Sequence, residues 1–294
     1  MINTLLHHAT SACCSSFVCS VGYPQFSALA LLGTVKLHIY FIKLSCDDNI
    51  PELLGQVKDR RELFSTLSFE LFNLGPQSTL IRDSEGDLSD PSDFYDRYDL
   101  PTLPMVSSYP PERRELTEWF RQLLENPMPF INEVVANTTR YSGIQIDIEP
   151  SWTEPNEIHG YIKFVNLLSR EMHKRGKTVT LAVASWVKAF NDFETLCTCD
   201  ADAIITMDTY TSGKTTDDHT NWDRAFFKMI NACPKEKAGI GIMTTNPNTN
   251  KPLSDEEVAH RFEMLKKYDV QHVGLWKGPI PENMYHHVID YIYN

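Results

Sequence analysis

The chain has 294 residues, of which 42% are hydrophobic, and it carries 27 basic and 39 acidic residues for a formal net charge of −12. This length allows a large buried core. Because the chain is acidic and no basic residues cluster, nucleic acid and anionic membranes are excluded as expected partners, and a neutral or cationic ligand is favoured.

Residues 1–34 form an N-terminal extension without a clear structural pattern. The apolar residues 26–44 are interrupted by Lys36, His38 and Lys43, which makes this segment a poor membrane span. The start of the chain lacks the basic residues of a secretory signal, and its apolar part comes late. A degenerate signal and a disordered segment are both open interpretations.

From residue 35 onward, short apolar strands alternate with amphipathic helices. Strands are predicted over residues 34–44, 66–74, 100–109, 141–150, 178–186, 201–210, 238–245 and 270–278. Helices are predicted over residues 50–64, 110–125, 156–177, 221–232, 254–269 and 283–293. Pro110 and Pro111 mark one helix start, and Ser254 with Glu257 three residues later forms a capping box at another. The polar residues 83–90 predict a solvated loop.

Eight strands, each followed by a helix or by room for one, predict a single (β/α)8 TIM barrel over residues 35–294. A doubly wound parallel sheet is the alternative, but no glycine-rich phosphate loop follows any predicted strand. No internal repeat or low-complexity tract indicates a second domain. In a barrel of this kind, the active site lies where the strands end.

The fourth predicted strand, "YSGIQIDIEP" at 141–150, carries two carboxylates. Its isoleucines share one face, whereas Gln145, Asp147 and Glu149 share the other. Because the outer face of a barrel packs on helices, we expect the polar trio to point inward, with Glu149 at the mouth. Neighbouring buried carboxylates push their pKa values apart, so one can stay protonated and act as an acid. A buried polar network or a loop cap is the structural alternative.

This stretch resembles the fourth-strand motif of glycoside hydrolase family 18, the chitinase-like barrels, which reads Asp-Gly-x-Asp-x-Asp-x-Glu. Gly143, Asp147 and Glu149 match, while Ser142 and Gln145 replace the first two aspartates. The resemblance implies that Glu149 donates a proton to the glycosidic oxygen. It also implies that Asp147 orients the substrate's 2-acetamido group, whose carbonyl oxygen is the nucleophile of a retaining, substrate-assisted mechanism, in contrast to the usual carboxylate pair.

Other strands match the family less closely. Trp276 resembles the last-strand tryptophan that forms the floor of the sugar subsite, although a core tryptophan is the alternative. Small residues on the fifth strand leave room inside, and Trp186 at its end is a further substrate-binding candidate. On the sixth strand the family's Met-x-Tyr-Asp becomes "MDTY" at 207–210, where polarity favours Asp208 and Tyr210 facing inward. The third strand lacks the family's Ser-x-Gly-Gly.

The sequence thus predicts a glycosidase for a β-linked N-acetylhexosamine oligosaccharide or polysaccharide, with no metal and no organic cofactor. Gln145, Asp208, Tyr210 and the two tryptophans are its substrate-binding candidates, with Asp208 and Tyr210 near the acetamido group. One alternative is a Glu149/Asp208 carboxylate pair, and family 25 lysozyme-like barrels also carry Asp-x-Glu on a strand. Another is a chitinase-like barrel that binds carbohydrate or stores protein without catalysis.

Several residues carry plainer expectations. His286 and His287 lack partners at ligand spacing and are expected on the surface or within a helix. No elbow glycines surround Ser185, which excludes a serine hydrolase. Trp152 and Trp222 follow the fourth and sixth strands, each as a sugar platform or a loop anchor.

The chain has seven cysteines. Cys197 or Cys199 precedes the sixth strand and Cys233 precedes the seventh, and adjacent strands of a barrel begin side by side. A disulfide between these two places is therefore expected. Such a bond would favour an extracellular or lysosome-like compartment.

Overall fold

The computed structural model describes residues 36–41, 50–82, 99–108, 113–210, 219–246, 251–276 and 279–293. All of them belong to one compact unit, Thr34–Asn294. The extension predicted over residues 1–34 and the loop predicted over residues 83–90 lie outside the described residues.

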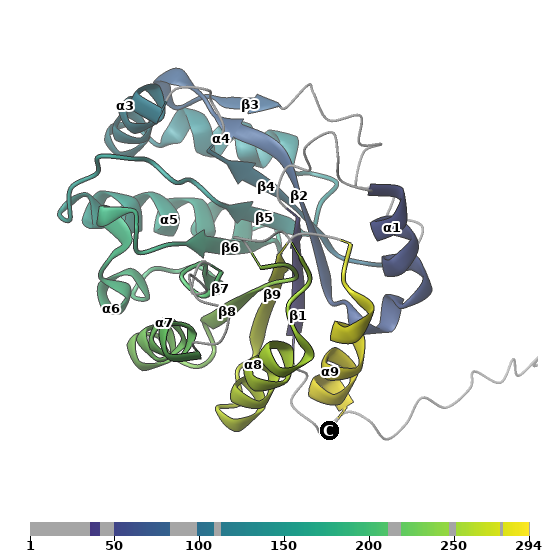
Figure 1. Ribbon diagram of the computed structural model, residues 1–294. Helices are drawn as coiled ribbons and strands as arrows, with labels where there is room; N and C mark the ends of the chain where they lie inside the picture. Colours follow the sequence, from purple (N-terminus) through teal and green to yellow (C-terminus); the bar gives the residue numbers. More distant parts are fainter. Residues whose placement is uncertain are drawn as a thin grey trace, which may run out of the picture. The chain divides into compact units, whose positions relative to one another are not determined.

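The described strands form one sheet that closes on itself (Figure 1). Eight parallel strands pair in the cyclic order β1, β2, β4, β5, β6, β7, β8, β9, and β9 pairs again with β1. This arrangement confirms the predicted (β/α)8 barrel. A short ninth strand, β3, pairs antiparallel with β2. The strands span Lys36–Phe41 (β1), Thr66–Leu74 (β2), Leu80–Arg82 (β3), Thr102–Ser107 (β4), Gly143–Ile146 (β5), Thr178–Val183 (β6), Ala203–Thr206 (β7), Ala238–Met243 (β8) and His272–Trp276 (β9).

Helices alternate with the strands along the chain and cover the outside of the sheet (Figure 1). The α-helices span Ile50–Asp59 (α1), Arg113–Glu125 (α3), Met128–Asn137 (α4), Glu157–His173 (α5), Phe193–Leu196 (α6), His219–Ala232 (α7), Asp255–Lys267 (α8) and Glu282–Tyr293 (α9). Short 3-10 helices span Arg61–Leu63 (η1), Pro76–Ser78 (η2) and Lys188–Phe190 (η3). Within the described residues, no helix is long and apolar enough to cross a membrane.

Two elements differ from the sequence prediction. α4 is not among the predicted helices because Pro127 and Pro129 interrupt the pattern, yet proline is tolerated at a helix start, which is where both lie. The short strand β3 is also not among the predicted strands; a turn at Gly75 leads through η2 into it. The predicted capping box of α8 is confirmed, with Ser254 and Glu257 exchanging hydrogen bonds.

The apolar residues separate into an outer core and an interior cluster. Ile144, Ile146 and Ile148 belong to the outer core, which lies between the sheet and helices such as α4 and α5 and includes the edge-to-face pair of Phe130 and Phe164. A smaller group, here called the interior cluster, fills the barrel itself. Its members are Met105, Ala182, Ala184, Ala203, Ile205, Met207, Tyr210 and Trp276.

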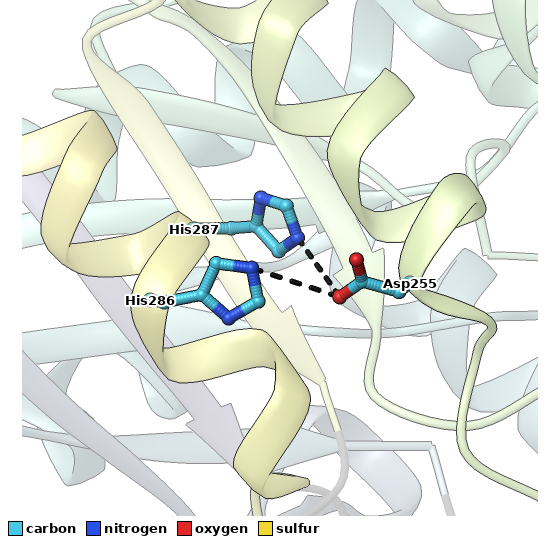
Figure 2. Close-up of side chains that lie close together, drawn as sticks. All are labelled: Asp255, His286 and His287. Atoms are coloured by element: carbon cyan, nitrogen blue, oxygen red, sulfur yellow. Dashed lines mark hydrogen bonds and ion pairs between the residues drawn. The ribbon is translucent and has the colours of Figure 1, made fainter.

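Side chains of α8 and α9 meet at one end of α8 (Figure 2). Asp255 Oδ1 lies 3.2 Å from His287 Nε2 and 3.6 Å from His286 Nε2. Both histidines lie on helix α9, as expected, and they share a partner that their spacing in the sequence does not indicate. Their partner comes from a helix about thirty residues earlier, a distance in sequence at which spacing rules give no signal.

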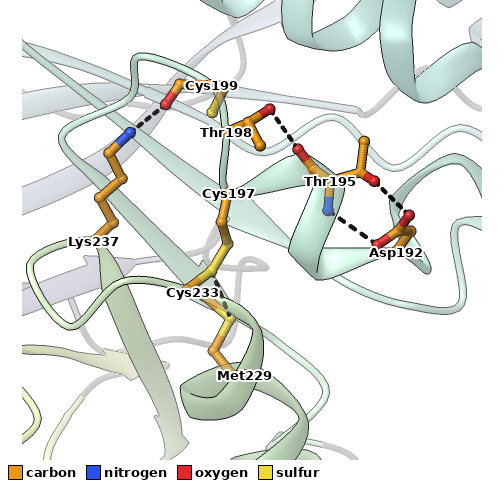
Figure 3. The surroundings of a disulfide bond; sticks show 8 residues. All are labelled: Asp192, Thr195, Cys197, Thr198, Cys199, Met229, Cys233 and Lys237. Atoms are coloured by element: carbon orange, nitrogen blue, oxygen red, sulfur yellow. Dashed lines mark hydrogen bonds between the residues drawn. A yellow bond between two sulfur atoms is a disulfide. The ribbon is translucent and has the colours of Figure 1, made fainter.

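A disulfide joins Cys197, which ends α6, to Cys233, which follows α7 (Figure 3). The two Cα atoms lie 5.3 Å apart, and the bond closes a loop of 36 residues. This confirms the expected disulfide and identifies its partner as Cys197. Cys199 is buried and its thiol is free.

The disulfide is expected to stabilise the barrel by restricting the unfolded chain. For a loop of 36 residues, the chain-entropy model gives about 4 kcal/mol, so replacing Cys197 and Cys233 by alanine should lower the free energy of unfolding by roughly that amount. Urea denaturation of the double variant measures the loss. Mass spectrometry of unreduced peptides that found only free thiols would contradict the bond itself.

A candidate active site at the barrel mouth

The carboxylates of "SGIQIDIE" lie where β5 ends. Gln145, the last but one residue of β5, and Asp147, just beyond the strand, are buried, and Glu149 is half-buried. The backbone N–H of Asp147 still bonds to the carbonyl oxygen of Val106 on β4, at 2.8 Å, so strand alternation continues past the end of β5. The isoleucines point into the outer core as strand parity predicts, which leaves the polar side chains for the barrel side.

Gly143 shows why the start of β5 needs a residue without a side chain. A Cβ atom at this position would lie 2.1 Å from the backbone oxygen of Thr178 on β6. Backbone cannot move aside as a flexible side chain can, so only glycine allows β5 and β6 to approach this closely. The glycine of the motif thereby sets the place of the strand that carries Asp147.

Asp147 is the most buried acid of the site. Its side chain is 4% exposed, and its Oδ1 has no hydrogen-bond partner among the residues that the structure describes. Burial raises the pKa of this carboxyl well above its ordinary value, and the charges of Glu149 and Glu70 raise the pKa further. Burial and the acidic neighbours thus favour the protonated form of Asp147.

Glu149 is held by an aromatic residue from the next strand. The indole Nε1–H of Trp186, which follows β6, donates a hydrogen bond of 2.7 Å to Glu149 Oε2. Trp186 is 49% exposed, so its ring lies at the protein surface beside the carboxylate. The structure therefore brings together Glu149 and Trp186, two of the residues that the sequence selected separately.

Tyr210 and Trp276 form a stacked pair inside the barrel. Their ring centroids lie 5.1 Å apart at an interplanar angle of 27°. Both rings are almost fully buried in the interior cluster. A Cβ atom on Gly241 of β8 would lie 2.2 Å from the Tyr210 ring, so a glycine at this position leaves the space that the ring occupies.

The predicted orientation of Asp208 is wrong. Met207 points into the interior cluster, while Asp208 accepts a hydrogen bond from the Ser185 backbone N–H at 2.7 Å and lies 3.8 Å from Lys228 Nζ on α7. Strand β7 ends at Thr206, and the turn that follows carries Tyr210 back inside. Ala203 and Ile205 also belong to the interior cluster, so alternation along this stretch places Met207 inside and Asp208 outside, and polarity was the wrong guide to its orientation.

Asp208 nevertheless influences the site indirectly. Its carboxylate holds the backbone of Ser185, and the next residue is Trp186, which donates to Glu149. The same loop is held a second time, because the N–H of Ala189 donates to Thr153 Oγ1 at 3.1 Å. Asp208 thus holds the backbone of the loop that carries Trp186.

Glu70 is an acid that the sequence analysis missed. It lies on β2, is 7% exposed, and its charge acts on Asp147. The alternation that identified Asp147 is also present in "TLSFELFNL", where Ser68 and Glu70 interrupt apolar residues. The pattern thus predicts an inward-facing Glu70 as well as a strand.

The two remaining mouth tryptophans have different roles. Trp222 is 2% exposed and stacks on Phe226 in the outer core, so it is a core residue. Trp152 is 60% exposed, and its backbone adopts a positive φ of 51°, which is uncommon for a residue with a large side chain. Its carbonyl oxygen accepts a hydrogen bond from Arg121, which fixes the loop. Trp152 thus remains available to a ligand.

No group of three metal-ligating side chains surrounds Asp147 and Glu149 within the described ranges. The one such group in those ranges is Asp255 with His286 and His287 on the outer helices. A cavity of about 640 Å³ is lined by residues at which strands begin, such as Thr66, Thr178 and His272. It therefore lies at the opposite end of the strands from the carboxylates.

Comparison with known proteins relates this fold to carbohydrate-active enzymes. No family model and no curated protein matches the sequence. A chitinase from Chromobacterium violaceum superposes with a TM-score of 0.71 at 12% identity, covering 89% of this chain and 99% of that chain. The spore cortex-lytic enzyme SleL of Bacillus megaterium gives 0.71 at 13% identity, covering 88% and 74%. Catalytic domain 2 of the Ostrinia furnacalis Group II chitinase gives 0.65 at 11%, covering 87% and 96%. The chain has the fold of these enzymes.

The raised pKa of Asp147 predicts how stability depends on pH. A carboxyl whose pKa is higher in the folded state opposes folding at every pH above the ordinary aspartate value, because the folded protein resists its ionisation. Asp147→Asn should therefore raise the free energy of unfolding at pH 7 by about 1 kcal/mol or more and change it little near pH 4. Urea denaturation at both pH values measures this difference.

Asp192→Asn is the matched control because its shift has the opposite sign. Hydrogen bonds from Thr195 lower the pKa of Asp192, so this variant should lose stability at pH 7. An Asp147→Asn variant that is equally destabilised at both pH values would show that Asp147 is an ionised and well-paired residue.

Proposed function

We propose that the chain is a chitinase-like glycoside hydrolase that cleaves a β-linked N-acetylhexosamine glycan with retention. The observation that carries this proposal is the pair of acids at the end of β5, one buried with a raised pKa and one half-buried at the mouth. The shared fold with chitinases and a cortex-lytic enzyme, and the partial family 18 motif, support the same reaction class.

In this mechanism Glu149 is the general acid. Its proton moves to the glycosidic oxygen as the bond from that oxygen to the anomeric carbon breaks. The carbonyl oxygen of the substrate's own acetamido group forms the new bond to that carbon. Glu149, now a carboxylate, then takes a proton from the water that opens this intermediate, which restores the enzyme.

Asp147 is the orienting partner of the acetamido group. Its carboxyl stays uncharged at the start because of burial and the neighbouring acids, so it can share a proton with Glu149 and still accept the acetamido N–H. Gln145 is the inward-pointing residue that precedes Asp147 along the strand. It is fully buried, and its side-chain amide lies on the same face as the Asp147 carboxyl. Because the acetamido oxygen is the nucleophile, the enzyme needs only one acid, Glu149, beside the leaving-group oxygen.

The aromatic residues divide into an accessible and a covered group. Trp186 is half-exposed and touches Glu149, so it is the aromatic surface that a sugar meets at the catalytic acid. Trp276 is 3% exposed and Tyr210 covers one of its faces, so a role as sugar floor requires Tyr210 to move. Trp152 offers a further exposed surface on the neighbouring loop.

The alternative carboxylate pair of Glu149 and Asp208 is less well supported. The Asp208 carboxylate contacts Lys228 and the backbone N–H of Ser185, on the outer side of the barrel from Met207. A carbohydrate-binding barrel without catalysis remains the second candidate. The replacement of two motif acids and the covered Trp276 favour it, whereas the presence of Glu149 favours catalysis.

The disulfide bears on the compartment in which the protein works. Disulfides persist in oxidising surroundings and are rare in the reducing cytosol. The bond between Cys197 and Cys233 therefore supports an extracellular or lysosome-like location.

Hydrolysis of defined glycans tests the function directly. The wild-type chain should cleave a glycan of β-linked N-acetylhexosamines, and Glu149→Gln should lower kcat by about a thousandfold or more while sugar binding is kept, because the amide has no proton to donate. Product analysis measures cleavage, and calorimetry measures binding.

Asp208→Asn serves as the control, since the Asp208 carboxylate contacts the Ser185 backbone N–H and Lys228 and has no role in the proposed mechanism. It should reduce kcat far less than Glu149→Gln. If the wild-type chain binds the glycans but cleaves none, the non-catalytic candidate holds. Equal cleavage of sugars that lack the acetamido group would contradict substrate assistance.

A further inference from the structure

Acidic side chains point into the barrel from two strands, β2 and β5. On β2, Leu67, Phe69 and Leu71 belong to the outer core, so Glu70 between them points to the interior. It is one of the few charged side chains that are almost fully buried among the described residues, at 7% exposure. A buried acid on the inward face is costly unless it interacts with another group there.

A β-bulge follows Glu70 directly. The register between β2 and β4 shifts between Glu70 and Phe72, and Leu71 and Phe72 both lie in the outer core. Two consecutive residues on the same face are what the extra residue of a bulge produces. The strand alternation thus restarts after Glu70, which turns Asn73 inward as well.

The register places Glu70 close to the motif strand. Glu70 pairs with Met105 on β4, and Met105 pairs with Gln145 on β5, so the three residues lie at one level of the barrel. Neighbouring strands are about 4.8 Å apart, which puts the backbones of Glu70 and Gln145 roughly 10 Å from each other. Both side chains point inward, and Asp147 is the next inward residue after Gln145.

We infer that Glu70 is a third acidic member of the site, a positioning residue that acts on Asp147 across the barrel. This inference rests on the function proposed above, because that mechanism uses an uncharged Asp147. Gln145 stands where the resembling motif has an acid, and Glu70 supplies negative charge at the same level from another strand.

The charges around Asp147 explain the effect. Glu70 of β2 and Glu149 of β5 both raise the pKa of its carboxyl, in addition to burial. On the helix side, burial raises the pKa of the Tyr161 phenol of α5, and the charges of Cys199 and Asp147 raise it further. Because burial, Glu149 and Glu70 all raise the pKa of Asp147, its protonated form is favoured, and its hydroxyl can be shared with Glu149.

The titration of Asp147 tests this inference without any substrate. Aspartate is labelled with ¹³C at Cγ in the full chain, and the Asp147 signal is identified by its loss in Asp147→Asn. Glu70→Gln should lower the titration midpoint of that signal, whereas Glu70→Asp, which keeps the charge, should return it toward the wild-type midpoint. Where glycan cleavage is measured, Glu70→Gln should lower kcat about tenfold with little change in KM.

Met105→Leu is the matched control, because Met105 lies between Glu70 and Gln145 and carries no charge. It should leave the midpoint unchanged. An unmoved midpoint in a folded Glu70→Gln variant would overturn the role of Glu70, even if glycans are cleaved. A lowered midpoint without cleavage of any glycan would keep the role and reject the proposed function.

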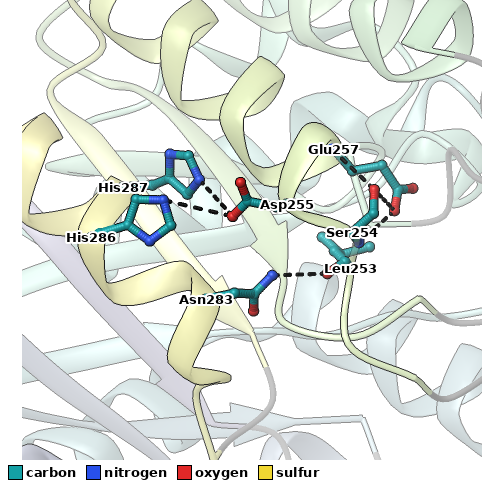
Figure 4. A network of polar contacts seen from close by, with 7 residues as sticks. All are labelled: Leu253, Ser254, Asp255, Glu257, Asn283, His286 and His287. Carbon is teal, nitrogen blue, oxygen red and sulfur yellow. Dashed lines mark hydrogen bonds and ion pairs between the residues drawn. The ribbon is translucent and has the colours of Figure 1, made fainter.

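A separate observation concerns the outer helices. Asp255, His286 and His287 each offer one ligand atom, and these three atoms lie within 4.8 Å of one another, with both imidazoles directed at the Asp255 carboxylate (Figure 4). Zinc at about 2.1 Å from tetrahedral ligands separates them by roughly 3.4 Å, close to the 3.2 and 3.6 Å between Asp255 and the two imidazoles.

The cluster is held in place from both helices. His287 is the least exposed of the three, and its ring stacks on Phe262 of α8 with centroids 6.1 Å apart. Asp255 follows Ser254, the N-cap residue of α8. The side-chain amide of Asn283 donates a hydrogen bond to the carbonyl oxygen of Leu253, the residue before Ser254. We propose that these three side chains bind a divalent transition metal such as zinc and connect α8 to α9. Two neutral imidazoles and one carboxylate suit zinc better than calcium or magnesium.

Zinc titration of the untagged, metal-free full chain tests this site. Calorimetry should show one zinc ion whose affinity falls at least tenfold in His286→Ala/His287→Ala, and zinc should raise the melting temperature of the wild-type chain only. His173→Ala is the control, because His173 pairs with Asp202 alone. A wild-type chain that binds no zinc, or a double variant that binds it equally well, would overturn the site.

Discussion

The burial of one carboxyl group inside a closed barrel is the constraint on which the site depends. A lone ionised acid cannot remain in such surroundings, so Asp147 must keep its proton or find a partner. The structure places two further acids near it and raises its pKa accordingly. A protonated acid of this kind is not a packing element, since an apolar residue would fill the same space at no electrostatic cost. Its presence is therefore best explained by chemistry.

The rest of the barrel keeps that group in place. Gly143 brings β5 against β6, and the isoleucines of β5 fix the strand in the outer core. On the next strand, the Trp186 loop is tied down through Asp208 and Thr153 and reaches back to Glu149. The two acids of one strand are thus controlled separately, Asp147 by burial and Glu149 by a hydrogen bond from a neighbouring loop.

The features that the sequence predicted correctly are those that depend on local patterns of apolar and polar residues. The eight strands, the inward polar face of β5 and the capping box of α8 depend on local periodicity, and the structure agrees with each of them. Asp208 was predicted to face inward because polarity decided the orientation of its strand, whereas the alternation of Ala203, Ile205 and Met207 into the interior cluster places it outward. Glu70 followed the same alternation and was overlooked, and the bulge beside it depends on the pairing with β4. The Asp255 contact with two histidines depends on helix packing, which spacing does not reveal.

The arrangement of aromatic residues bears on how a substrate could reach the acids. Trp186 and Trp152 are exposed on neighbouring loops, which the hydrogen bond from Ala189 to Thr153 connects. Trp276 lies deeper, under the stacked ring of Tyr210, and the missing side chain at Gly241 gives that ring its room. Under the proposed function, a sugar bound at Trp186 would contact Glu149 without any change in the interior, whereas one bound on Trp276 would first have to displace Tyr210. Binding at the rim followed by insertion over Trp276 is the order of events that this packing would favour for such a substrate.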